Sequence, residues 1–226
     1  MKKEKNIIKV QRYESPCGLL LLGSFGDKLC LCDWQVEKHR DHVDRRLKRM
    51  LCAEFEVGTS EVIEKAARQL DEFFAGKRKE FDVPLLFVGT DFQKAVWNKL
   101  LEIPFGKTVS YGEMAQRIGM SKAVRAVANA NGANSISIFA PCHRVIGSDH
   151  SLTGYGGGLP AKKFLLDWNP NPDWFCKSKV VRFVSSHDEI SDVNICVLSI
   201  RLFDEEIWCL ICSKYLIYAS KRFLNC

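Results

Sequence analysis

The chain has 226 residues, of which 46% are hydrophobic and 27% charged, and its formal net charge is +6 at pH 7. This balance is that of a globular protein with one large domain or two small ones. No apolar run is long enough to span a membrane, and a charged N-terminus without a following apolar stretch argues against secretion. We therefore expect a cytoplasmic protein with reduced cysteines, and the positive charge permits an anionic partner without naming one.

Three short apolar segments separated by turn residues begin the chain and predict an antiparallel meander. The segments are Ile7 to Glu14, Leu19 to Phe25 and Lys28 to Trp34. Cys30 and Cys32 lie two residues apart and therefore on one face of the third strand. A metal site is conceivable there, but no set of histidines or cysteines at ligand spacing lies nearby, so a pair of core cysteines is favoured.

A charged segment, a helix and an interrupted strand follow. Residues 37–51 are dense in Arg, Lys, His and Asp and predict a solvated helix or loop. Ser60 stands before an amphipathic helix, because apolar residues recur after it at helical spacing until a glycine stops them. Phe81 to Val88 is expected to be a short edge strand broken by Pro84, and we place a domain boundary near Gly89.

Two capping boxes mark helix starts in the second half of the chain, one from Thr90 to Gln93 and one from Ser110 to Glu113. Ser121 is expected to cap a further helix, from Lys122 to Asn131. Two short helices joined by a tight turn with a glycine form a helix-turn-helix pattern. Such a pattern is typical of DNA-binding proteins, but generic helical hairpins share it.

The second helix of this pair combines small residues with one arginine. Alanines occupy positions 123, 126, 128 and 130, and Arg125 projects from among them. Small side chains let a helix approach another surface closely, and a single arginine there could enter a groove or replace an extruded base. An ordinary surface arginine on an alanine-rich helix remains equally compatible with the pattern.

A cysteine and a histidine stand next to each other after an apolar run. Residues 138–140 are read as a buried strand that stops at Pro141, and Cys142, His143 and Arg144 follow. Cysteine is a strong nucleophile as the thiolate, and a neighbouring histidine supplies a candidate base. A buried structural cysteine with a chance histidine beside it is the alternative for the pair taken alone.

Five short sequence motifs follow one another in the second half of the chain. They are Tyr111 in Val-Ser-Tyr-Gly-Glu-Met-Ala, Arg125 in Ala-Val-Arg-Ala-Val, Asn134, Pro-Cys-His-Arg-Val at 141–145, and Gly-Tyr-Gly-Gly-Gly-Leu at 154–159. In these elements the chain resembles the O6-alkylguanine-DNA alkyltransferases, from about Phe92 to Leu166. Related alkyltransferase-like proteins carry another residue in place of the cysteine, whereas this chain keeps Cys142.

The resemblance implies an α+β fold in three parts. Residues 1–88 would form a ribonuclease-H-like domain with an antiparallel sheet and a helix. Residues 89–168 would form a winged-helix-like domain that binds DNA and accepts the alkyl group. Residues 169–226 would be an atypical extension of unknown structure, in which Cys209 and Cys212 form only a weak zinc or redox signal.

The resemblance also implies a single-turnover DNA repair reaction that needs no cofactor or metal and for which a monomer suffices. Cys142 would take the alkyl group from O6-alkylguanine in double-stranded DNA, and the acceptance of O4-alkylthymine stays open. His143 would accept the thiol proton through a water, Tyr111 would donate to the leaving guanine, and Asn134 would orient the imidazole. The expected DNA and substrate contacts are Ser121, Ala123, Arg125, Pro141, Arg144, Val145, Tyr155, Gly156 and Gly157.

One position departs from the family pattern. The family glutamate that orients the histidine corresponds to Asn169, and Asp167 lies on a different helix face. We therefore expect a raised thiol pKa and slower transfer, and an altered reading frame beyond Trp168 is a live hypothesis. Two alternatives to an alkyltransferase stay open, namely a lesion-binding protein with impaired transfer and an unrelated cysteine hydrolase.

Overall fold

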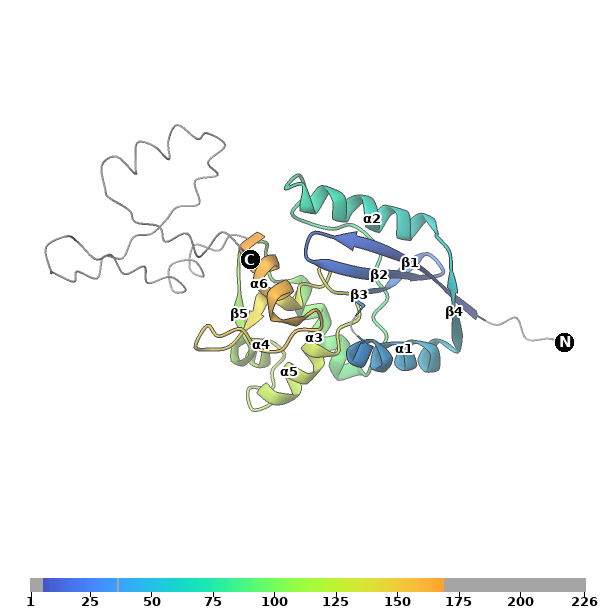
Figure 1. Ribbon diagram of the computed structural model, residues 1–226. Helices are drawn as coiled ribbons and strands as arrows, with labels where there is room; N and C mark the ends of the chain where they lie inside the picture. Colours follow the sequence, from blue (N-terminus) through green and yellow to red (C-terminus); the bar gives the residue numbers. More distant parts are fainter. Residues whose placement is uncertain (1–5, 36, 169–226) are drawn as a thin grey trace, which may run out of the picture. The chain divides into compact units, whose positions relative to one another are not determined.

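The computed structural model describes residues 6–35 and 37–168. The first half is built on a four-stranded sheet in the order β3-β2-β1-β4 (Figure 1). Strands β1 (Asn6–Ser15), β2 (Gly18–Phe25) and β3 (Lys28–Trp34) pair antiparallel, which confirms the meander that the sequence predicts. Cys30 and Cys32 are fully buried, as expected for core residues.

No sequence pattern predicted the fourth strand. Strand β4 (Ala53–Val57) pairs parallel with β1, so the sheet is mixed rather than purely antiparallel. A parallel neighbour requires a crossover connection, and helix α1 (Glu37–Leu51) provides it. The charged segment is therefore a helix and not a loop, and it buries only a narrow apolar side that includes Val43 and Leu47.

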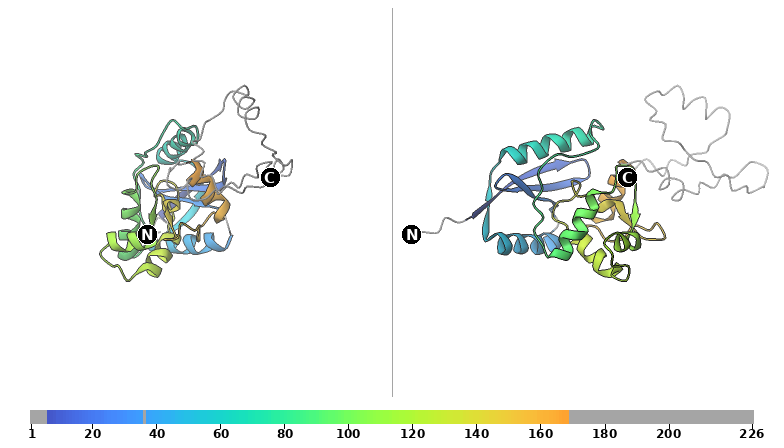
Figure 2. Two further views of the ribbon diagram at one scale, coloured as in Figure 1. Left: turned by 90° about the vertical axis from the view of Figure 1, so that its left-hand side faces the viewer. Right: turned by 180° about the vertical axis from the view of Figure 1, so that it is seen from behind.

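Helices α1 and α2 (Glu61–Phe74) cover opposite faces of the sheet (Figure 2). On one face, Ile8 and Val10 pack with the buried residues of α1. On the other face, Leu20 and Leu22 pack with the apolar stripe of α2. Ser60 caps α2 by accepting a hydrogen bond from the Ile63 amide, as the sequence predicts. The alternation along the strands thus divides the sheet between two separate cores.

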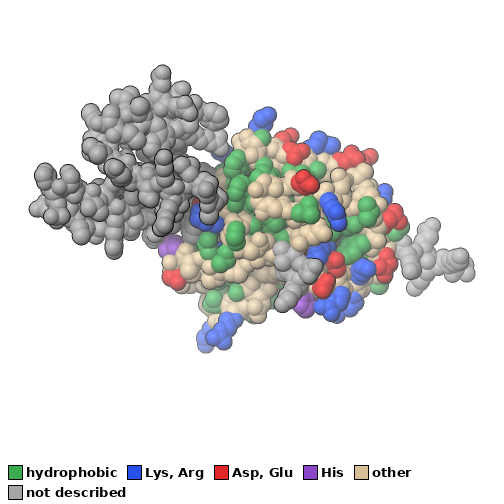
Figure 3. All heavy atoms as spheres, in the orientation of Figure 1, with side chains coloured by type: hydrophobic (Ala, Val, Ile, Leu, Met, Phe, Trp, Pro, Cys, Tyr) green, Lys and Arg blue, Asp and Glu red, His purple; other side chains and the backbone are tan. Residues whose placement is uncertain are grey.

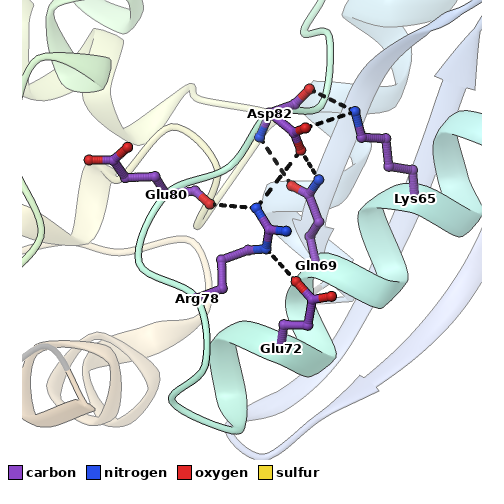
Figure 4. Close-up of polar contacts among 6 residues, drawn as sticks. All are labelled: Lys65, Gln69, Glu72, Arg78, Glu80 and Asp82. Carbon is purple, nitrogen blue, oxygen red and sulfur yellow. Dashed lines mark hydrogen bonds and ion pairs between the residues drawn. The ribbon is translucent and has the colours of Figure 1, made fainter.

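The segment after α2 is extended but is not the expected strand. Only a single bridge joins Leu85 to Leu29, with hydrogen bonds from the Leu29 amide to the Pro84 carbonyl (2.9 Å) and from the Leu86 amide to the Leu29 carbonyl (2.8 Å). Proline at 84 has no amide to donate, so a regular ladder cannot form across it. A polar network instead fixes the segment to α2 (Figure 4).

This network, called the α2 network below, joins three side chains of α2 to two of the following segment. Its members are Lys65, Gln69, Glu72, Arg78 and Asp82. Arg78 Nε donates to Glu72 Oε2 at 2.6 Å, and Lys65 Nζ lies 3.2 Å from Asp82 Oδ2. The Asp82 amide donates to Gln69 Oε1 at 3.1 Å. All of these contacts lie at the surface or near it.

The second half is helical. Its elements are α3 (Asp91–Leu101), β5 (Val109–Ser110), α4 (Tyr111–Arg117), α5 (Val124–Gly132), the 3-10 turn η1 (Cys142–Arg144), β6 (Val145–Ile146) and α6 (Gly158–Trp168). Both predicted capping boxes are confirmed, at Thr90 and at Ser110. The prediction for Ser121 is wrong, because α5 begins at Val124 and Ala123 is its uncapped N-terminal flank.

The apolar run before Pro141 is a turn and not the buried strand that the sequence suggests. Ile138 has φ = 72°, a left-handed conformation that no strand contains. The run is buried because the sheet covers it. The Cys32 amide donates to the Ser135 carbonyl at 2.8 Å, and the Ser137 amide donates to the Cys32 carbonyl at 2.6 Å. Strand β3 therefore carries the polypeptide that leads to Cys142.

Within the described part of the chain, no helix is both long and apolar enough to cross a membrane. Acidic and basic side chains are intermixed over the half of the molecule that carries the sheet (Figure 3).

Candidate active site

Cys142 opens the turn η1 and is 4% exposed. Burial raises the pKa of its thiol, and the carboxylate of Asp33 adds to that effect. The side chains of Asn134 and Ser137 and the ammonium of Lys162 act in the opposite direction and favour the thiolate. The site thus holds a protonated thiol at rest, with groups already placed to stabilise the anion once the proton leaves.

Asn134 holds the turn that precedes the cysteine. Its Nδ2 donates to the Ala140 carbonyl at 3.0 Å, and its Oδ1 accepts from the Ile136 amide at 3.0 Å. The side chain is 2% exposed, so these bonds are made away from water. The expected role in fixing the loop fits this geometry, whereas the expected contact with the imidazole of His143 stays a prediction.

A second asparagine, which the sequence analysis missed, reaches the cysteine from α5. Asn131 Nδ2 donates to the Cys142 carbonyl at 3.3 Å, and the residue is 3% exposed. Its side chain also lies beside the Tyr111 hydroxyl. The sequence signal that could have identified it is an asparagine in the last turn of an alanine-rich helix. Through Asn131, α5 is connected directly to the backbone of η1.

His143 is fully buried, and neither ring nitrogen has a hydrogen-bond partner among the described residues. Burial, with the neighbouring cations Arg144 and Lys162, holds its pKa well below the usual range. The imidazole is therefore neutral, so one ring nitrogen is available to accept a proton. That it accepts the proton of Cys142 through a water remains a prediction.

Lys162, on α6, is the other site residue that the sequence analysis did not single out. It is fully buried, and its Nζ donates to the Val145 and Thr153 carbonyls at 2.8 Å each. The same ammonium lies 5.8 Å from the centre of the Tyr111 ring. Burial lowers its pKa to about 8, while the nearby Cys142 has the opposite effect. The sequence signal that could have identified it is its helical spacing to Leu165 and Leu166, three and four residues later.

Tyr111, the first residue of α4, packs against the same hydrophobic cluster as Cys142. Partial burial raises the pKa of its hydroxyl, whose neighbours are Thr153 and Asn131. The hydroxyl is therefore protonated at neutral pH and available as a donor. Strand β5 ends at the residue before Tyr111, and it pairs in parallel with β6, which directly follows η1.

Arg144 turns into the protein. It is 5% exposed, its Nη1 donates to the Ile103 carbonyl at 2.7 Å, and its guanidinium lies 5.6 Å from the centre of the Phe105 ring. Burial lowers its pKa to about 10. With Phe105, Phe139 and Pro141 it lines a cavity of about 610 Å³. These contacts support the loop after α3, and a DNA contact by Arg144 stays a prediction.

The expected DNA-binding residues on and before α5 are accessible. Arg125 and Ser121 are exposed, and Ala123 is half-buried. Val124, on the same surface, is 38% exposed although it is apolar. The surface is therefore free to meet a large partner.

The glycine-rich loop brings its expected residues next to the cysteine turn. Tyr155 packs on the cluster that contains Cys142, Tyr111 and Val145. Its ring makes an edge-on contact with Trp34 of β3, with ring centres 5.7 Å apart. Pro141 lines the cavity next to Arg144, whereas Val145 and Tyr155 pack with Cys142. That these residues form one substrate pocket with the glycines at 156 and 157 stays a prediction. Asn169, Cys209 and Cys212 lie outside the described residues.

Two family models match most of the described chain. The 6-O-methylguanine DNA methyltransferase ribonuclease-like domain matches residues 8–87, and the DNA-binding domain of the same family matches residues 91–170. A methylated-DNA–protein-cysteine methyltransferase of Methanosarcina acetivorans is 46% identical over 154 residues, which cover 68% of this chain and 93% of the relative.

Two solved structures from Mycobacterium tuberculosis are similar as well. An O6-methylguanine methyltransferase has a TM-score of 0.60 and 42% identity, covering 72% of this chain and 92% of that one. The structure of OGT in complex with DNA has a TM-score of 0.60 and 41% identity, covering 73% of this chain and 95% of that one.

Proposed function

Because the chain belongs to the 6-O-methylguanine DNA methyltransferase family, we propose that it repairs O6-alkylguanine in double-stranded DNA by moving the alkyl group to Cys142. Residues 89–168 would bind the DNA and accept the group, and residues 1–88 would support them. We further propose that it works as a monomer, since one chain accepts one alkyl group. A reducing cytoplasm suits a protein whose acceptor must remain a thiol.

The buried thiol with its surroundings carries this proposal. Cys142 is enclosed, and its thiolate is favoured by Asn134 and Ser137 from the preceding turn and by Lys162 from α6. Tyr111 and Tyr155 pack on the same cluster. A cysteine that serves packing alone has no need of a buried ammonium beside it, and burying one is costly.

The proposed reaction is a displacement at saturated carbon. The neutral imidazole of His143 takes the thiol proton through a water, and the thiolate attacks the carbon bonded to guanine O6. The S–C bond forms while the C–O bond breaks, and the electron pair stays on the guanine. The Tyr111 hydroxyl donates a hydrogen bond to that developing negative charge, and the released guanine takes up a proton from water. The product is a thioether that water does not readily hydrolyse, so each chain acts once.

Access to the lesion requires that the base leave the duplex. The O6 substituent lies within the stack, where a thiol on a protein cannot reach it. We propose that α5 approaches the duplex through its small residues and that Arg125 fills the gap that the extruded nucleotide leaves. Unstacking costs about a few kcal/mol and less for a poorly paired lesion, which contributes selectivity.

Mass spectrometry of the intact chain tests the proposal. The chain is mixed with a duplex that contains O6-methylguanine, and a duplex with guanine at that position is the control. We expect a stoichiometric gain of one methyl group, located on Cys142 by peptide mapping and absent in Cys142→Ser. Cys52→Ser is the matched control, because Cys52 is an exposed free cysteine far from Cys142 in the sequence.

Three other outcomes would contradict the proposal. Binding of the lesion duplex without a mass gain would identify a lesion-binding protein. A mass gain that survives Cys142→Ser would move the acceptor elsewhere. Turnover of an ester substrate without DNA would indicate a cysteine hydrolase.

A further inference from the structure

Trp34, at the end of β3, lies behind the glycine-rich loop and is 2% exposed. It belongs to the N-terminal sheet, but its ring packs edge-on against Tyr155 of the loop, with ring centres 5.7 Å apart. Glycines flank the indole. A methyl group on Gly18 would lie 3.4 Å from its Cζ3 atom, and one on Gly157 would lie 2.4 Å from its Cδ2 atom.

Glycine is needed at position 157 because the indole leaves no room for a side chain, and not because the backbone there is left-handed. It is not among the glycines with positive φ, whereas Gly154 and Gly158 on either side are. The added methyl group would meet three atoms of the indole within 2.8 Å, and all of them belong to the rigid ring system. An alanine at position 157 therefore cannot be accommodated unless the loop or the indole moves.

A polar contact accompanies the ring contact. The indole N–H of Trp34 is a hydrogen-bonding neighbour of the Tyr155 hydroxyl and acts against burial, which holds the pKa of that hydroxyl well above its usual range. The two polar groups are therefore enclosed side by side where the loop faces the sheet. Replacing Trp34 removes this polar contact together with the bulk of the ring.

We infer that Trp34 is a positioning residue for the glycine-rich loop and that its bulk limits the size of the alkyl group that Cys142 can accept. This rests on the proposed function, because the loop is taken as a wall of the base pocket. The indole packs against Tyr155, which packs on the cluster that contains Cys142, and it leaves no free space behind Gly157. A smaller side chain at position 34 lets the loop retreat and enlarges the pocket.

A double-mutant cycle tests the contact. Rate constants for transfer from O6-methylguanine duplex are measured for Gly157→Ala, Trp34→Leu and the double variant. A loop displaced by about an ångström slows transfer by about a hundredfold, which is the effect expected for Gly157→Ala. In the double variant the space is free, so the rate should recover to within about tenfold of the parent. Additive losses would overturn the inference.

The alkyl-size claim has its own readout. The same variants are compared on duplexes with O6-methylguanine and O6-benzylguanine, and Trp34→Leu should raise the benzyl-to-methyl rate ratio by about tenfold relative to the parent. Trp34→Phe keeps most of the bulk and should leave the ratio nearly unchanged. Phe73→Leu is the control for lost stability, since Phe73 is fully buried in the same core and packs on Phe74, Phe81 and Phe105.

The two possible failures are distinguishable. If the parent chain gains no alkyl mass from either duplex, the proposed function fails. If the parent transfers methyl but Trp34→Leu and Phe73→Leu give the same benzyl-to-methyl ratio, only the inference about Trp34 fails.

Discussion

Two groups of charged side chains in this molecule differ in their burial and in the partners that they bind. The α2 network pairs each cation with a carboxylate at the surface. Lys162 and Arg144 are buried, and they donate hydrogen bonds to backbone carbonyls rather than to acids. Exposed pairs contribute little because water screens them, whereas a buried cation without an acid is costly. Of the two buried cations, Lys162 is the one that favours the Cys142 thiolate, so we expect its cost to serve the chemistry there.

Replacing Lys162 gives the sharpest test of this contrast. Lys162→Met removes the hydrogen bonds to Val145 and Thr153 and the cation that favours the Cys142 thiolate. We expect alkyl transfer to slow by about a hundredfold or more and the free energy of unfolding to fall by about 2–4 kcal/mol. The thiol pKa, measured from the pH dependence of alkylation by iodoacetamide, should rise. An unchanged thiol pKa would contradict the assigned role.

Replacing Arg144 tests whether a buried cation near the cysteine can stabilise the fold without changing the thiol pKa. Arg144→Met leaves the Ile103 carbonyl without its donor, so the free energy of unfolding should fall by about 1–3 kcal/mol in a urea titration. The arginine is not among the groups that shift the Cys142 thiol, so the thiol pKa should change less than in Lys162→Met. Equal changes in the two variants would erase the distinction between the two buried cations.

The pH dependence of the free energy of unfolding tests whether Lys162 is a buried cation with a lowered pKa. The pKa of Lys162 is lowered from 10.5 to about 8, so between these values the unfolded chain binds more protons than the folded one. The free energy of unfolding of the parent relative to Lys162→Met should therefore rise with pH across this window, by about 1–3 kcal/mol. Chemical denaturation at several pH values measures it. A difference that falls with pH would have the wrong sign.

The smallest effect is expected at the surface. Arg78→Ala removes the 2.6 Å contact with Glu72, but both side chains reach water, so the free energy of unfolding should change by less than about 1 kcal/mol. Alkyl transfer should be unchanged, because Arg78 contacts Glu72, the Glu80 carbonyl and Asp82 rather than the cysteine turn. A tenfold loss of transfer would show that the two regions are coupled.

Features that depend on a few neighbouring residues were predictable from the sequence. The capping boxes at Thr90 and Ser110 need only side chains three positions apart, and the meander needs only alternation and turns. The strand β4 was missed because a five-residue strand is stable only through its pairing with β1. Ser121 is a good capping residue, but the helix begins at Val124, two residues after the predicted start at Lys122.

Site residues divide in the same way. Cys142, His143 and Tyr111 stand in local motifs, so their candidacy could be read from the sequence. Trp34 and Lys162 matter through partners far along the chain, such as Gly157 and Val145. The turn at Ile138 resembles a strand in its apolar sequence, and its left-handed backbone accompanies hydrogen bonds between the preceding residues and Cys32 of β3, which lies far away in the sequence.

The short ladder of β5 and β6 pairs Val109 with Val145 and Ser110 with Ile146. Because strands can slip past each other only in whole residues, the spacing between Tyr111 and Cys142 can change only in steps of about 3.3 Å. One such step exceeds the length of a hydrogen bond. An insertion after Ser110 would therefore uncouple the phenol from the sulfur completely rather than gradually, so this stretch tolerates replacement of side chains better than any change in its length.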